Sequence, residues 1–203
     1  MFVFHQAPAF APAPAGDAID LLTPFAVIGA AAVTLAALGA RGRVLVFGFV
    51  AAVLYVDGHG IHLSANSIAN EDPVGDAERV TYFWDERFSH VEALLGWFGL
   101  VGAFALAEAQ RATAPQPGAD RHGRGVAVAT VILLGFTFFT STVEGQTWPL
   151  LLLAVPVFVA WARRRPRPLL RTAAGAYLLG VALLAIWALI NGGVPEFTDA
   201  GLL

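Results

Sequence analysis

Residues 44–70 read VLVFGFVAAVLYVDGHGIHLSANSIAN, and this stretch decides the fold. The run Val44–Val56 contains no charged side chain, and helical spacing of apolar and polar residues continues toward Asn70. A helix of roughly 20 apolar residues is long enough to cross the hydrocarbon core of a bilayer. We therefore predict a membrane-spanning helix that starts near Val44 and ends between Ser64 and Asn70.

The composition of the whole chain agrees with this interpretation. Of its 203 residues, 57% are hydrophobic and only 13% are charged, and the mean hydropathy is +0.67. Soluble domains carry about 25% charged residues, so the composition indicates an integral membrane protein. The chain has no cysteine, which excludes disulfides, thiolate nucleophiles and cysteine-ligated metals. Nothing in it suggests a nucleic-acid partner.

Six apolar segments follow one another along the chain. They cover about residues 21–40, 44–70, 88–108, 125–142, 148–162 and 170–191. The fifth is short and contains Pro156, so flanking residues or a locally thin membrane must help it to span. The sequence thus predicts an all-α bundle of six transmembrane helices over residues 21–192. An Ala/Pro-rich, extended segment (1–20) precedes it and a tail (193–203) follows it.

The arginines predict the orientation of this bundle. All twelve basic residues are arginine, and ten of them fall on alternate connections between the apolar segments. These ten are Arg41, Arg43, Arg111, Arg121, Arg124, Arg163, Arg164, Arg165, Arg167 and Arg171. Cytoplasmic loops of membrane proteins carry an excess of Lys and Arg. We therefore expect a multi-pass protein of the cell membrane with its N-terminus and its C-terminus both outside the cytoplasm.

Polar residues interrupt the second segment at a defined depth. Tyr55, His59, His62, Asn66 and Asn70 are three or four residues apart and so share one helix face. At 1.5 Å per residue, His59 lies about 22 Å from the start of the helix, in the outer third of the membrane. Asp57 and Ser64 fall on another face. Gly58 and Gly60 either admit a neighbouring backbone or break the helix here.

Polar residues of the third and fourth segments reach the same depth. Glu86, Ser89 and His90 share a face at the start of the third helix, and Asp85, Ser89 and Glu92 form an adjacent stripe. The fourth helix ends with a polar face that includes Glu144. The cytoplasmic half has no comparable cluster. Ionisable residues inside a membrane are costly and mark functional sites.

These side chains are of the types that bind a divalent metal. His59, His62 and His90, together with Glu86 or Asp57, supply the imidazoles and carboxylates that hold Zn²⁺ or a non-haem iron. Zn²⁺ is the ion we expect. Glu144 or Glu92 is then the candidate general acid or base, and Ser89 is an alternative nucleophile. The same residues also suit a hydrogen-bonded packing cluster without a metal.

This arrangement resembles that of the intramembrane metal hydrolases of the alkaline ceramidase and progestin-receptor-like superfamily. Those proteins also gather His, Asp and Ser from several helices near one membrane face. The resemblance implies an intramembrane hydrolase, but it concerns the site and does not extend along the chain. That superfamily has seven helices and a late HxxxH pair, both of which this sequence lacks, so we transfer no residue roles from it.

The leading hypothesis is therefore a membrane-embedded, metal-dependent hydrolase of a lipid or amphiphilic substrate. A transporter or a proton- or cation-conducting protein is the first alternative, although such a pathway needs polar positions in both halves of the membrane. A haem protein with a pair of histidine ligands and a non-catalytic membrane assembly subunit are the others. All of these readings expect membrane lipid as a partner.

Overall fold

The computed structural model describes residues 8–10, 13–14, 19–71, 76–111, 121–165, 167–197 and 199–202. Within these ranges the chain is helical apart from connecting turns, the segment after the last helix and two short antiparallel strands near its start, β1 (Pro8–Phe10) and β2 (Ala13–Pro14). The helices are α2 (Thr23–Ala37), α3 (Arg43–Glu71), α4 (Asp76–Tyr82), the π-helix η2 (Phe83–Ser89), α5 (His90–Gln110), α6 (Arg121–Glu144), α7 (Trp148–Arg164) and α8 (Pro168–Asn191). The predicted all-α class is confirmed for the described residues.

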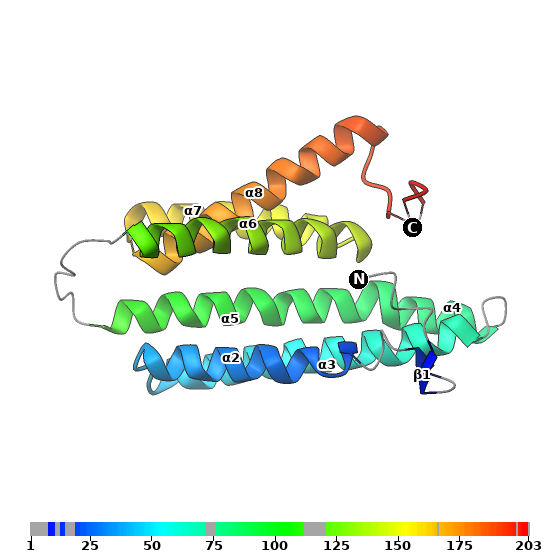
Figure 1. Cartoon of the computed structure of the whole chain (residues 1–203), viewed down its shortest axis with the longest axis horizontal. Helices are drawn as coiled ribbons and strands as arrows, with labels where there is room; N and C mark the ends of the chain where they lie inside the picture. Colours follow the sequence, from blue (N-terminus) through cyan, green and yellow to red (C-terminus); the bar gives the residue numbers. More distant parts are fainter. Residues whose placement is uncertain are drawn as a thin grey trace.

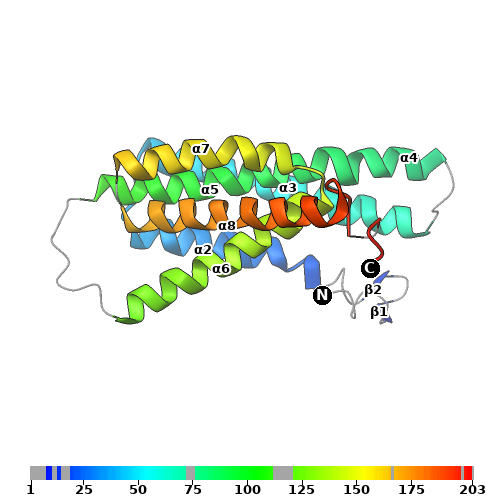
Figure 2. The same ribbon diagram turned by 90° about the horizontal axis from the view of Figure 1, so that it is seen from above.

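The long helices run back and forth along one direction (Figures 1 and 2). In Figure 1, α2, α3 and α5 lie on one side of the bundle and α6, α7 and α8 on the other. We call the end where α3, α6 and α8 finish the polar end, and the opposite end, where α3 and α8 begin, the arginine end. The ten arginines on alternate connections lie at or next to the arginine end.

Within the part of the chain that the structure describes, four helical stretches are long and apolar enough to cross a membrane. They are Arg43–Ile68, Asp76–Gln110, Gly123–Glu144 and Pro168–Asn191. The helix α2 is apolar but has only 15 residues, a length of about 22 Å at 1.5 Å per residue, against a hydrocarbon core of about 30 Å. The helix α7 has 17 residues. These four stretches support a membrane protein.

The third predicted segment starts earlier than the sequence suggests. We expected it to begin at Phe88, but helix already begins at Asp76 and continues through η2 into α5 without a break. The expectation was wrong because Asp85, Glu86 and Arg87 interrupt the apolar pattern, whereas such side chains do not prevent a helix. The other boundaries differ by a few residues, as is usual at helix ends.

Glycines bring α3 and α5 into close contact. A methyl group on Gly58 would lie 2.5 Å from the Ala93 nitrogen and 2.7 Å from the Ser89 carbonyl oxygen. Gly96 on α5 packs in the same way against the backbone of Tyr55. The helix is not broken at Gly58, so the first of its two predicted roles is confirmed. Close approach through small residues is how membrane helices gain packing contacts.

Aromatic side chains form the core between the two sides of the bundle. Tyr177 of α8 is fully buried, with its ring centroid 4.5 Å from Phe138, 4.6 Å from Phe158 and 5.3 Å from Phe98. These rings belong to α6, α7 and α5, so one cluster ties all four helices together. Ring pairs at this spacing add to the stabilisation that burial provides.

The residues after α8 pack back onto the bundle. Gly192, in the left-handed conformation (φ 68°), ends α8, as glycine commonly does. The Trp187 indole N–H then donates to the Pro195 carbonyl at 2.9 Å. Phe197 packs against Trp187 and Phe139, with centroids 5.0 and 5.8 Å apart. This part of the predicted tail therefore covers the polar end of α6 and α8.

Candidate metal site

Three side chains from three elements converge at the polar end. They are His62 of α3, Asp85 of η2 and His90, the first residue of α5. One possible ligand atom from each lies within 4.8 Å of the others. Two imidazoles and one carboxylate at this spacing form a group that can hold a metal ion.

The π-helix places Asp85 on the same side as His90. They are five positions apart in the sequence, and in an α-helix, at 3.6 residues per turn, they would point about 140° apart. A π-helix has i→i+5 hydrogen bonds, so one of its turns brings residues five apart nearly into line. The η2 segment covers Phe83–Ser89, immediately before His90. Single π turns are frequent at functional sites.

Contacts among the three side chains are direct. Nδ1 of His62 hydrogen-bonds Oδ1 of Asp85, and the rings of His62 and His90 have centroids 4.7 Å apart. The Asp85 side chain is only 7% exposed, whereas that of His62 is 31% exposed. A buried carboxylate needs a partner to offset its lost hydration. Here His62 is that partner. Because its side chain is partly exposed, the group is also accessible from outside the bundle.

Two further glutamates face this group. Glu86 Oε2 lies 3.5 Å from His90 Nδ1, and neither atom has a hydrogen-bond partner among the described residues. Glu144, at the end of α6, interacts electrostatically with both Glu86 and His62. Its carboxyl group is within reach of the backbone N–H of Phe197. Both acids are therefore available for proton transfer or for binding a cation.

Glu196 of the C-terminal segment adds a third acid to this surface. It interacts electrostatically with Glu86 and Glu144. Partial burial raises its pKa, and the neighbouring carboxylates of Asp199 and Glu144 raise it further, because each disfavours a second negative charge nearby. The segment after α8 thus adds to the negative potential of the polar end.

The turn between α6 and α7 covers His90. A methyl group on Gly145 would lie 2.5 Å from Cγ and 2.6 Å from Cβ of His90. Gln146 holds this turn with its side-chain amide, which donates to the carbonyls of Val143 at 2.7 Å and Val194 at 3.2 Å. Only a residue without a side chain fits at position 145, and this fit keeps the His90 ring in place.

The structure therefore brings together three of the five predicted metal ligands, His62, His90 and Glu86. His59 lies one helical turn away, where its Nε2 contacts the Asp20 carbonyl oxygen at 2.9 Å, and its ring stacks on Tyr55. Asp57 lies on the other side of the contact between α3 and α5, beside Glu92. His59 and Asp57 are therefore not among the side chains whose possible ligand atoms lie within 4.8 Å of one another, although the His59 and His62 rings have centroids 6.3 Å apart.

The residues predicted as general acid, general base or nucleophile do not all lie next to the metal-binding group. Glu144 faces the metal-binding group, while Glu92 faces Asp57. Ser89 is fully buried, and its hydroxyl donates to the Asp85 carbonyl, so it is not presented to a substrate. The side chain of Asn70 lies outside the described residues.

Sequence reasoning missed two members of this site, Asp85 and Glu196. Asp85 was placed in a stripe with Ser89 and Glu92 because α-helical spacing was assumed. The i, i+5 spacing of Asp85 and His90 is the signal that would have found it, if a π turn had been considered. Glu196 carried no signal, because only the folding back of the chain after Gly192 brings it to the site.

Comparison with known proteins adds no relative. No family model matches the chain, and no curated protein or solved structure matches it. The geometry of the site and the membrane-type helices therefore carry the functional argument.

Proposed function

We propose that this chain is a multi-pass membrane enzyme in which His62, Asp85 and His90 bind a divalent metal ion. Zn²⁺ is the ion that we expect. The observation that carries the proposal is the convergence of these three side chains, whose possible ligand atoms lie within 4.8 Å of one another. Catalytic zinc sites use three protein ligands and leave a position open. The reaction we propose is hydrolysis of a lipid or another amphiphile.

In such a site the metal ion supplies an activated water at neutral pH. Side chains of the protein would transfer the protons. Glu144, held near the backbone N–H of Phe197, and Glu86, beside His90, are the candidate general base and general acid. A positioned carboxyl group of this kind contributes about 10²- to 10⁴-fold to a rate.

The substrate class follows from the location of the site. The three ligands belong to the apolar stretches Arg43–Ile68 and Asp76–Gln110. With the arginine end in the cytoplasm, the six helices cross the membrane and the polar end faces outward. Flanking residues and local thinning of the bilayer then accommodate the short α2 and α7. A substrate that reaches this depth needs an apolar part, which favours a lipid.

The metal is tested by elemental mass spectrometry on the protein purified in detergent. We expect about one metal ion per chain in the wild type and in His59→Ala, the matched control one helical turn away. His62→Ala, Asp85→Asn and His90→Ala should each lose it, because each removes a ligand. Two histidines and a carboxylate also suit Fe²⁺, and the same spectrum tells iron from zinc. Equal metal content in all five proteins, or none in the wild type, would refute the site.

The reaction is tested by incubating the metal-loaded protein with ester- and amide-linked lipids and analysing products by mass spectrometry. Glu144→Gln and Glu86→Gln should keep the metal and lose about 10²-fold or more of the turnover. A metal-loaded protein that cleaves no member of the panel, but moves protons or cations across liposomes, would favour the transporter alternative.

A further inference from the structure

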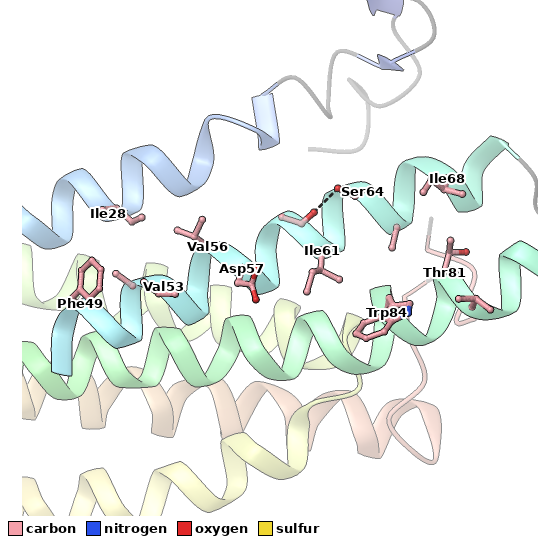
Figure 3. A pocket seen from close by; sticks show the side chains of 14 residues that line it. Ile28, Phe49, Val53, Val56, Asp57, Ile61, Ser64, Ile68, Thr81 and Trp84 are labelled. Carbon is pink, nitrogen blue, oxygen red and sulfur yellow. Dashed lines mark hydrogen bonds between the residues drawn. The ribbon is translucent and has the colours of Figure 1, made fainter. Parts of the chain in front are cut away.

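A large groove on the surface of the described residues does not belong to the metal site. It is an open groove of about 1010 Å³ along the outer face of α3, between α2 and the α4–η2 segment (Figure 3). Six of its lining residues are Phe49, Val53, Val56, Asp57, Ser64 and Trp84. The groove runs beside the apolar stretch Arg43–Ile68, so it is placed to face the membrane.

The lining of the groove is mostly apolar along its whole length. Phe49 and Val53 line it toward the arginine end, and Ile61 and Ile68 line it toward the polar end (Figure 3). Asp57 sits between these two parts and is the charged residue of the lining. A hydrocarbon chain fits along the apolar wall, and a cationic head group fits at Asp57. The groove therefore suits a single-chain cationic amphiphile.

Asp57 is an acidic side chain in this groove and favours a positively charged ligand. It is exposed in the groove about 21 Å from the start of α3 at 1.5 Å per residue, within a hydrocarbon core of about 30 Å. Among the described residues, no arginine or histidine forms an ion pair with it. Beside it, outside the lining of the groove, is Glu92, whose carboxyl group is within hydrogen-bonding reach of Asp57. Carboxyl groups at such a depth are costly and normally have a partner.

We propose that this groove binds a cationic, single-chain amphiphile. Its primary ammonium group would contact Asp57, and its hydrocarbon chain would lie along Val56, Val53 and Phe49. An ammonium offers three donors and a positive charge to the Asp57 carboxylate. A charge-assisted hydrogen bond of this kind is about twice as strong as a neutral one.

This site is separate from the metal site. Gly58 packs against Ser89 and Ala93, and that contact divides the interface of α3 and α5 into two sides. His62 and His90 lie on one side, while Asp57 and Glu92 lie on the other. The proposal therefore does not rest on the metal, and chelation should leave amine binding unchanged.

The test uses the full chain in phosphatidylcholine nanodiscs and the fluorescence of Trp84, which lines the groove and is 43% exposed. A dibrominated octadecylamine is the quenching probe, and the matching dibrominated alcohol is its uncharged counterpart. The signal of Trp84 is the part of the quenching that is lost in Trp84→Phe. We expect saturable quenching, with the amine binding about tenfold or more tightly than the alcohol, as expected for a hydrogen bond to a charged group.

Three variants test where the amphiphile binds and which side chain produces the preference for the amine. Asp57→Asn should abolish the preference for the amine, while Asp76→Asn, which changes an exposed carboxylate outside the groove, should keep it. Gly60→Leu should abolish saturable binding of both probes, because Gly60 lines the groove and has open space beside it. Equal binding of amine and alcohol, or an amine preference that survives Asp57→Asn, would overturn the proposal. Binding that survives Gly60→Leu would place the amphiphile elsewhere and overturn it too.

Discussion

Gly58 of α3 lies against the backbone of Ala93 of α5, so close that a methyl group on it would come within 2.5 Å of the Ala93 nitrogen. This contact determines how α3 is placed along and around α5. It therefore determines that His62 meets Asp85 and His90, and that Asp57 meets Glu92 on the opposite side.

Gly58→Ala should destabilise the protein and weaken metal binding together. Overpacking a tight contact costs about 1–3 kcal/mol, and the helices must move apart, which separates His62 from Asp85. The measurement is denaturant unfolding in detergent micelles, beside a zinc titration. Gly60→Ala is the matched control, because its side chain would enter open space and alanine is favoured over glycine in helices by about 0.5–1 kcal/mol. If both variants behave alike, the contact at Gly58 has no special role.

Zinc affinity should fall as the pH is lowered from about 8 to about 5, the range in which histidine commonly titrates. His62 and His90 must be neutral to donate to a metal, so protons compete with it. Glu86 lies beside His90 without being one of the three ligands, so Glu86→Gln should cost at most the loss of about 10- to 100-fold in affinity that is usual for a residue next to a ligand, and the site should still fill at saturating zinc. Asp85→Asn should cost more. Competition with a chromogenic chelator measures each constant. An affinity that is independent of pH would argue against histidine ligands.

The C-terminal segment should dock more firmly at low pH. The raised pKa of Glu196 means that the folded segment binds a proton more tightly than the undocked one. Docking is therefore favoured at low pH and weakens as the pH rises from the ordinary carboxyl range through this raised pKa.

Hydrogen exchange measures this docking at the amides of Ala200 and Leu202, which donate to the carbonyls of Glu196 and Phe197. After correction for intrinsic exchange rates, their protection should decline with pH in the wild type and stay constant in Glu196→Gln. Asp76→Asn, far along the chain, should behave as the wild type. A pH-dependent protection that persists in Glu196→Gln would assign the effect to another acid.

Tyr177→Phe should leave the protein equally stable or stabilise it by about 1 kcal/mol. The Tyr177 hydroxyl is fully buried and has no hydrogen-bond partner among the described residues, and burying an unpaired hydroxyl costs about 1–3 kcal/mol in proteins. Thermal unfolding in detergent is the measurement, with Phe138→Leu as a destabilising variant of the same aromatic cluster. A marked loss of stability in Tyr177→Phe would show that the hydroxyl has a partner after all.

The sequence alone determined the class of the protein and the residues that share a helix face. The uncharged run before Asp57 and the low charge of the whole chain indicated long apolar helices, and the described residues contain four such helices. The periodicity of α3 placed His59 and His62 on one face, and the i, i+4 spacing placed Glu86 beside His90. These features are local, because they depend only on the repeat of one helix.

Tertiary structure decided which of these faces meet. A helical repeat does not determine how a helix is rotated against its neighbour. For this reason the prediction from sequence placed Asp57 and His59 in one site with His62 and His90. Because Gly58 packs against α5, Asp57 lies on the side of α3 away from the metal site. His59 contacts the Asp20 carbonyl oxygen instead of the other ligands. Asp85 joins the site because a π turn, whose repeat differs from that of an α-helix, brings it into line with His90. Such a turn depends on the packing around it, and the pattern of apolar residues does not encode it.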